Sequence, residues 1–276
     1  MTLKTKKILF ITGSVVVVLF LISLFLVYGA GSTDPITKFF KKVYPAMVVG
    51  DEVMSVYDFE HYQTLAANLD SSASAGQIRN QMIKNLQAQA LARKLNVFPT
   101  DSQVSAEEVF IVKNKQSEFQ DVLAKYFALN KLFFEKLVVT PSAVSARLAI
   151  KYNSAQPKNK LEQILAKIKS GEKFEDLAKT NSDDGATGQF GGDMGFFERG
   201  EILPELEAFI INAPMGSVYE QIIITRLGRH IIYPVETADV DGTKKWHAKH
   251  ILLRTDGYDD WFTDQVSEIR VWQIFR

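Results

Sequence analysis

The sequence predicts an α+β protein in which an apolar N-terminal helix and a helical region precede a small mixed domain. Residues 8–28 form an uncharged, almost wholly apolar run. Apolar side chains then recur at helical spacing through residues 33–155. The remaining residues, 156–276, combine a glycine-rich turn with short helical and β-branched patterns. We therefore expect three parts, with boundaries near residues 32 and 155.

Composition excludes several classes of function. The 276 residues include no cysteine, so a disulfide, a thiolate metal site and a cysteine nucleophile are all excluded. The 32 basic residues balance 32 acidic ones, and this neutrality gives no support for binding to nucleic acid.

The N-terminal segment is predicted to be a transmembrane signal-anchor. Lysines at positions 4, 6 and 7 precede residues 8–28, and about 20 apolar residues span the hydrocarbon core of a bilayer. These lysines favour a cytoplasmic location for the N-terminus, so residues 1–32 are expected to form a cytoplasmic tip and the transmembrane anchor. A cleaved signal peptide is the alternative, because residues 28–30 offer a passable cleavage site.

Residues 33–155 are predicted to form a small hairpin followed by helices. Gly50 and Asp51 lie between two short apolar runs, which is typical of a hairpin turn. Three serines have the spacing of a helix-capping residue: Ser55, Ser74 and Ser105. A long amphipathic helix is expected over residues 119–137, closed by Pro141.

Residues 181–235 contain the densest set of motifs in the chain. Residues 191–197 read Gly-Gly-Asp-Met-Gly-Phe-Phe, in which paired glycines suggest a tight turn that leads into a strand. A short helix is predicted by apolar residues at helical spacing: Ile202, Leu206 and Phe209. Two β-branched runs, residues 219–225 and 230–235, then indicate a hairpin.

These segments resemble the parvulin family of peptidyl-prolyl cis/trans isomerases. Four pieces stand in the family's order: residues 182–184, 191–197, 200–207 and 228–232. The resemblance implies a four-stranded antiparallel sheet surrounded by helices. Residues 33–155 resemble the helical chaperone domain of SurA- and PrsA-type foldases, through the hairpin at residues 48–53 and the turn at 92–101. Because Lys38, Lys41 and Lys42 follow the apolar run, the expected extracytoplasmic location of most of the chain depends partly on this second resemblance.

One family strand is displaced in the sequence. Parvulins begin with a His-Ile-Leu-Val strand, but residues 146–152, which precede the first family helix, contain no histidine. A matching motif occurs in residues 246–254, so we predict a circular permutation in which this segment pairs with residues 230–235. A truncated second repeat starting at His250 is the alternative, although no second glycine motif follows it.

The resemblance assigns the candidate site residues. It implies a hydrogen-bonded network around His230 and His250, with Asp184 facing the substrate carbonyl and Thr225 supplying a hydroxyl. It also implies an apolar pocket for the proline ring, formed by Met194, Phe197, Ile202 and Leu206. Two other histidines, His61 and His247, are interpreted as structural.

The expected function is extracytoplasmic prolyl isomerisation combined with chaperone activity. Rotation about a prolyl bond has a barrier of ~18–20 kcal/mol and breaks no covalent bond, so neither a cofactor nor a metal is implied. The expected partners are unfolded or proline-containing polypeptides, together with the membrane around residues 8–28. A non-enzymatic holdase or docking protein is the alternative, because Leu206 replaces a family Phe and Leu203 a polar residue of some relatives.

Overall fold

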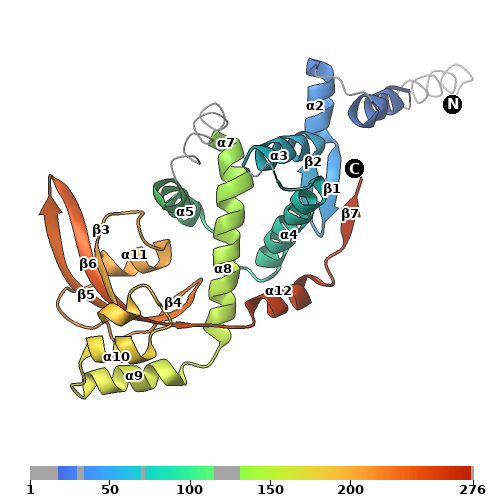
Figure 1. The fold of residues 1–276 in the computed structure, drawn as a ribbon. Helices are drawn as coiled ribbons and strands as arrows, with labels where there is room; N and C mark the ends of the chain where they lie inside the picture. The colour runs from blue at the N-terminus through green and yellow to red at the C-terminus, as the bar shows by residue number, and fades with distance from the viewer. Residues whose placement is uncertain (1–17, 30–33, 70–71, 115–130, 275–276) are drawn as a thin grey trace, which may run out of the picture. The chain divides into compact units, whose positions relative to one another are not determined.

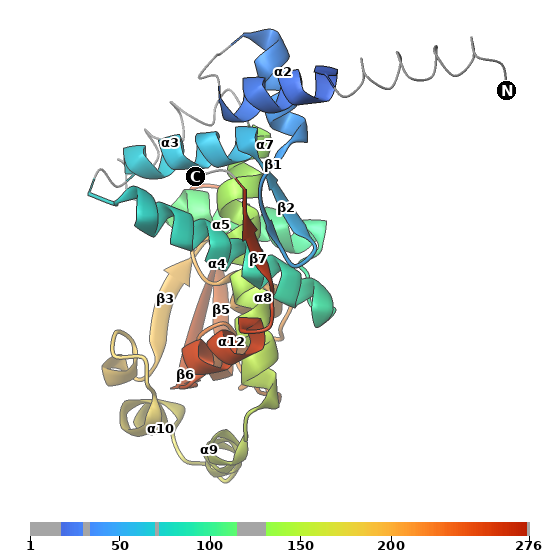
Figure 2. The same ribbon diagram turned by 90° about the vertical axis from the view of Figure 1, so that its right-hand side faces the viewer.

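The computed structural model describes residues 18–29, 34–69, 72–114 and 131–274 (Figures 1 and 2). The chain divides into two compact units, one comprising Met1–Ala90 with Glu268–Arg276 and the other Leu91–Ser267. Residues 18–28 are helical, and the first part of the predicted membrane span lies outside the described residues. No helix within those described ranges has the length and apolar character needed to cross a membrane.

The first unit contains a three-stranded sheet in the order β2-β1-β7. The predicted hairpin is confirmed as β1 (Pro45–Val49) and β2 (Glu52–Ser55), which are antiparallel and joined through Gly50 at a φ of 61°. The C-terminal strand β7 (Val271–Gln273) pairs with β1. The last residues of the expected isomerase domain therefore lie in the N-terminal unit, because β1 has a free edge for them.

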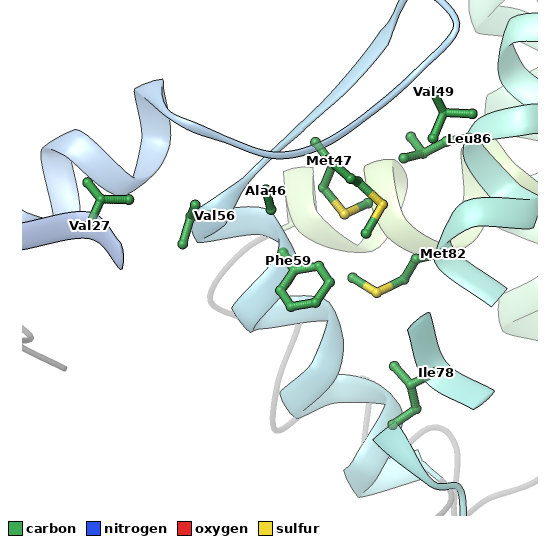
Figure 3. Packing of buried hydrophobic residues seen from close by; sticks show 10 residues of the cluster. Val27, Ala46, Met47, Val49, Val56, Phe59, Ile78, Met82 and Leu86 are labelled. Atoms are coloured by element: carbon green, nitrogen blue, oxygen red, sulfur yellow. The ribbon is translucent and has the colours of Figure 1, made fainter. Parts of the chain in front are cut away.

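Three helices cover this sheet or flank it. They are α2 (Pro35–Val43), α3 (Val56–Leu69) and α4 (Ala75–Lys94). The Ser55 hydroxyl accepts from the Asp58 amide at 3.1 Å, which confirms the predicted cap of α3. Phe59 of α3, Met82 of α4 and Met47 of β1 meet in a buried apolar core (Figure 3). This core gives the hairpin and the two helices a common hydrophobic contact.

The second unit begins with helices whose bounds differ from the prediction. Helix α5 (Asp101–Asn114) is opened by Thr100, which forms a capping box with Gln103, and not by Ser105. Three consecutive segments, α7 (Lys131–Phe134), η1 (Glu135–Val139) and α8 (Thr140–Ala155), continue one helical path.

The sequence predicted that Pro141 ends the long helix, but the helical path continues through this residue. The turn η1 before it is a π-helix, and such a wide turn accommodates a proline that lacks an N–H. Residues 119–130 of the predicted helix lie outside the described part of the chain.

A four-stranded antiparallel sheet in the order β3-β6-β5-β4 forms the centre of the second unit. The strands are β3 (Asp193–Phe197), β4 (Ile223–Thr225), β5 (Gly228–Val240) and β6 (Thr243–Arg254). Strand β6 pairs with both β3 and β5, which confirms the predicted place of residues 246–254 in the sheet.

The connection between β5 and β6 explains how the displaced strand reaches this place. Val240 pairs with Thr243 across a two-residue turn, in which Asp241 and Gly242 have φ angles of 53° and 76°. Positive φ at both positions is typical of a type I′ hairpin, whose twist matches that of the strands. A short local turn thus delivers β6 to the edge of β5.

Helices cover both faces of this sheet. Helices α9 (Asn159–Lys169) and α10 (Phe174–Asn181) pack against Ile231 and Ile251 on one face. Helix α11 (Pro204–Ile210) packs against Ile232 and Ala248 on the other face. In the chain, α12 (Tyr258–Val266) follows β6 and precedes β7. Ile232 and Ala248 alternate with the residues that face α9 and α10, as the period of a strand requires.

Candidate functional site

The predicted histidines lie on the α11 face of the sheet. Side chains two residues apart in a strand share a face, so His230 lies beside Ile232 in β5 and His250 beside Ala248 in β6. Both histidines are buried. Their rings stack with centroids 5.2 Å apart and an interplanar angle of 26°. Two histidines that are 20 positions apart in the sequence therefore meet because β5 and β6 are neighbours.

A continuous chain of hydrogen bonds joins the four predicted catalytic residues. Thr225 Oγ1 lies 2.9 Å from His230 Nε2, and His230 Nδ1 lies 3.1 Å from His250 Nδ1. His250 Nε2 lies 2.8 Å from Asp184 Oδ2. The structure thus brings together all four residues that the motif comparison singled out.

The pKa directions determine how the protons are arranged along this chain. Burial lowers the pKa of His230 to about 3, and it also lowers the pKa of His250, despite the opposing effect of Asp184. Burial alone would raise the pKa of Asp184, but hydrogen bonds from Thr187 and His250 outweigh it and lower this pKa. At neutral pH both imidazoles are therefore neutral and the carboxyl group is ionised.

Only one direction of donation satisfies these charges. An ionised carboxylate can only accept, so His250 donates from Nε2 and accepts at Nδ1 from His230 Nδ1–H. His230 then accepts at Nε2 from the Thr225 hydroxyl. The tautomers follow from the hydrogen-bond network, and the network runs in one direction from Thr225 to Asp184.

The glycine motif has a clear structural role beside this network. Gly192 has a φ of 81°, and its carbonyl accepts from the His250 amide at 2.8 Å. A Cβ atom at this position would lie 2.2 Å from the His250 carbonyl oxygen. Only glycine permits this approach, which holds the start of β3 against the histidine of β6.

Thr187 is a site residue that the sequence reading missed. Its hydroxyl donates to Asp184 Oδ2 at 2.6 Å and lies 3.0 Å from His250 Nε2. The available signal was the Asp-x-x-Thr spacing, since a hydroxyl three residues on can return to the carboxylate in a tight loop. Thr187 fixes the orientation of Asp184 and favours its charged form.

The four predicted pocket residues belong to one apolar cluster on the α11 face. Phe197 and Leu206 are almost fully buried, whereas Met194 and Ile202 are half-buried. The buried pair therefore forms the base of the cluster, and Met194 and Ile202 offer the accessible apolar surface. Their predicted contact with a proline ring stays a prediction.

His247 and Asp193 form a separate pair. Their side chains approach at 2.7 Å, and Asp193 also accepts from the Gly195 amide at 2.8 Å. His247 alternates with His250 along β6, so it points to the opposite face of the sheet. This geometry fits the structural role expected for His247.

A cavity of about 260 Å³ lies on the side of α11 that faces α5 and α8. Its walls include Ala106, Ala143, Ile150 and Ala208. None of the predicted site residues lines it, so this cavity is distinct from the predicted proline pocket.

The sheet with its paired histidines, carboxylate and glycine turn defines a parvulin-type domain. In agreement, residues 113–238 match the family described as the PPIC-type PPIASE domain. The chain thus contains a PPIC-type, or parvulin-type, domain. The match ends before β6, which carries His250.

The chain is similar to SurA chaperones and PrsA foldases. A chaperone SurA of Chromobacterium violaceum is 32% identical over 121 residues, which cover 43% of this chain and 28% of that protein. A foldase protein PrsA of Caldanaerobacter subterraneus is 27% identical over 177 residues, covering 56% of each chain. The chain thus spans about a quarter of the SurA relatives and about half of the PrsA relative.

A solved structure of a foldase protein PrsA from Streptococcus pneumoniae is 15% identical and covers 78% of this chain and 81% of that one. Its TM-score is 0.21, which is too low to bear on the fold.

Proposed function

We propose that the protein is a peptidyl-prolyl cis/trans isomerase that assists the folding of extracytoplasmic polypeptides. The observation that carries this proposal is the hydrogen-bonded chain from Thr225 to Asp184, on the same sheet face as the apolar cluster around Leu206. The similarity to SurA chaperones and PrsA foldases supports polypeptides as clients.

The geometry suggests how such a site lowers the barrier to rotation. A planar amide carries extra negative charge on its oxygen through resonance, and twisting the bond reduces this charge as the resonance is lost. A carboxylate such as Asp184, placed beside the carbonyl oxygen, raises the energy of the planar form relative to the twisted one. Met194 and Ile202 would hold the proline ring away from water.

The neutral histidines keep this carboxylate in place. His250 donates to Asp184, and His230 fixes the tautomer of His250 through the bond between their Nδ1 atoms. A buried, one-directional network of this kind is pre-organised, so it need not rearrange as the bond twists.

The test is NMR exchange spectroscopy on a short proline-containing peptide with the full chain. We expect faster cis/trans exchange with the wild type and a large loss with Asp184→Asn, which keeps the shape of the side chain but removes its charge. Asp259→Asn, on the exposed start of α12, is the matched control. No acceleration by the folded wild type would exclude the isomerase.

A non-enzymatic holdase is the second candidate. It is favoured by Leu206, which is 2% exposed and so presents little surface to a substrate. Suppression of client aggregation by a folded wild type that leaves the peptide exchange rate unchanged would support this alternative.

We further propose that the chain is anchored in the membrane through residues 8–28, with most of the chain on the extracytoplasmic side. Residues 18–22 of the N-terminal helix expose large apolar side chains, and α2 exposes Ile36, Phe39 and Val43 along one face. Such a face suits a helix that lies at a lipid surface. Release of the full chain from membranes by alkaline carbonate would contradict the anchor.

A further inference from the structure

The hairpin turn between β4 and β5 holds one end of the hydrogen-bond network. Thr225 ends β4 and pairs with Gly228 at the start of β5. The Leu227 amide in this turn donates to the Thr225 hydroxyl at 3.1 Å. Since that bond occupies one lone pair of the hydroxyl, the conformation of the turn determines how the Thr225 proton points at His230.

Helix α8 is hydrogen-bonded to this turn through Asn153. The Asn153 side-chain amide donates to the Thr225 carbonyl at 2.7 Å, and both residues are almost fully buried. A buried carbonyl without a donor is costly, so this bond restricts the position of the Thr225 backbone. Within the described residues, no hydrogen bond joins Asn153 to a histidine. Asn153 therefore acts on the network only through Thr225.

The start of β5, next to this turn, makes a second contact with the end of α8. Arg229 donates from Nη2 to the backbone carbonyls of Asn153 and Gln156, the latter at 2.7 Å. These carbonyls belong to the C-terminal end of the helix, where a cation is favourable. Arg229 therefore fixes the helix end from which Asn153 reaches Thr225.

Helix α5 contacts the turn through an ion pair. Arg226 donates to both carboxylate oxygens of Glu107 at 2.8 and 2.5 Å, and to Glu205 of α11 at 2.9 Å. Glu107 also accepts from Ser142 of α8 at 2.6 Å. A bidentate guanidinium–carboxylate pair is directional, so it limits rotation of the turn.

Helix α5 also holds the loop on the other side of the site. Asn114 donates to the Gly200 carbonyl at 2.6 Å, and Lys113 bonds Glu198 at 2.8 Å. This loop connects Phe197 to Ile202, two of the predicted pocket residues. Helix α5 thus contacts both segments that border the site, and α8 contacts one of them, the β4–β5 turn.

We propose that Asn153 is a positioning residue of the isomerase site, which orients the Thr225 hydroxyl toward His230 by holding the Thr225 carbonyl. Helices α5 and α8 are then part of the site's supporting structure, although the sequence assigns them to the chaperone region. This inference rests on the proposed isomerase function for its kinetic consequence, but not for its structural one.

The decisive variant is Asn153→Asp, which keeps the side-chain shape and replaces the amide donor by an acceptor that opposes the Thr225 carbonyl. We expect kcat for the proline peptide to fall about tenfold, the equivalent of one hydrogen bond, with KM unchanged. In ¹⁵N NMR of the full chain, we also expect His230 to lose the pure Nδ1–H tautomer of the wild type.

Asn159→Asp is the matched control, because it adds the same charge at the exposed first residue of α9. Wild-type His230 resonances and kcat in folded Asn153→Asp would overturn the proposal. If that variant does not fold, Asn153→Ala carries the test with the same two readouts. A wild type without isomerase activity would refute the proposed function, while the His230 resonances would still decide the positioning role.

Discussion

Lowering the pH from about 7 to about 5 should destabilise the second unit through His230. The pKa of this histidine falls from 6.5 to about 3 because the ring is buried in the folded protein. Below pH 6.5, His230 therefore binds a proton in the unfolded chain but stays neutral in the folded protein. The stability is fully present above this pH, and it is lost as the pH falls towards 3.

The magnitude follows from this difference in proton binding. Each pH unit in that window costs about 1.4 kcal/mol per histidine, so His230 alone removes about 2 kcal/mol between about pH 7 and about pH 5. The pKa of His250 is also lowered by burial, which adds a loss of the same sign. Asp184 contributes only at more acidic pH, because its lowered pKa lies below the ordinary value of 3.8.

Urea unfolding at constant ionic strength measures this effect. The buried Trp246 lies in the same unit and reports on it by fluorescence. The wild type should lose about 2 kcal/mol more than His230→Gln over this pH interval. His61→Asn, which removes an exposed histidine of α3, should behave as the wild type. Equal losses in the wild type and His230→Gln would refute the assignment of a buried neutral histidine.

Three further outcomes test the fold and the site. Gly192→Ala should cost at least about 2 kcal/mol in urea unfolding, because its Cβ would meet the His250 carbonyl. Gly195→Ala, at a similar positive φ but with open space, should cost about 1 kcal/mol, and equal costs would refute the close-approach argument. Thr187→Val should raise the Asp184 pKa measured by NMR titration, whereas Thr187→Ser should leave it unchanged. A chain ending at Ala238 loses β6 and should lose cooperative unfolding of the second unit by calorimetry, unlike one ending at Ser267.

Local patterns made much of the fold predictable. The turn at Gly50 needs positive φ, and it was evident as a glycine-containing turn between two apolar runs. The capping box at Ser74 and Gln77 formed as its spacing indicated. Pro141 misled the prediction, because a π-helical turn before it lets the helix continue, and no local rule anticipates such a turn.

Contacts between distant segments were not predictable in the same way. Arg226 and Glu107 are 119 positions apart, and neither stands in a motif that names the other. Asn153 resembles any polar residue near a helix end, and its role depends on a carbonyl 72 positions away. The compact second unit starts at Leu91, far before the boundary near residue 155 that the sequence patterns predicted.

By itself, the sequence determined the pairing partner of the displaced strand and the two histidines that meet across it. It could do so through the resemblance to parvulins, because the motifs that carry this resemblance and their order are present in the sequence itself. Only the tertiary structure decided three features. They are the direction of hydrogen-bond donation from Thr225 to Asp184, the pairing of β7 with β1, and the hydrogen bonds of α5 and α8 to the β4–β5 turn. These features depend on burial and on contacts between side chains from distant segments. A local sequence pattern predicts neither the burial nor these contacts.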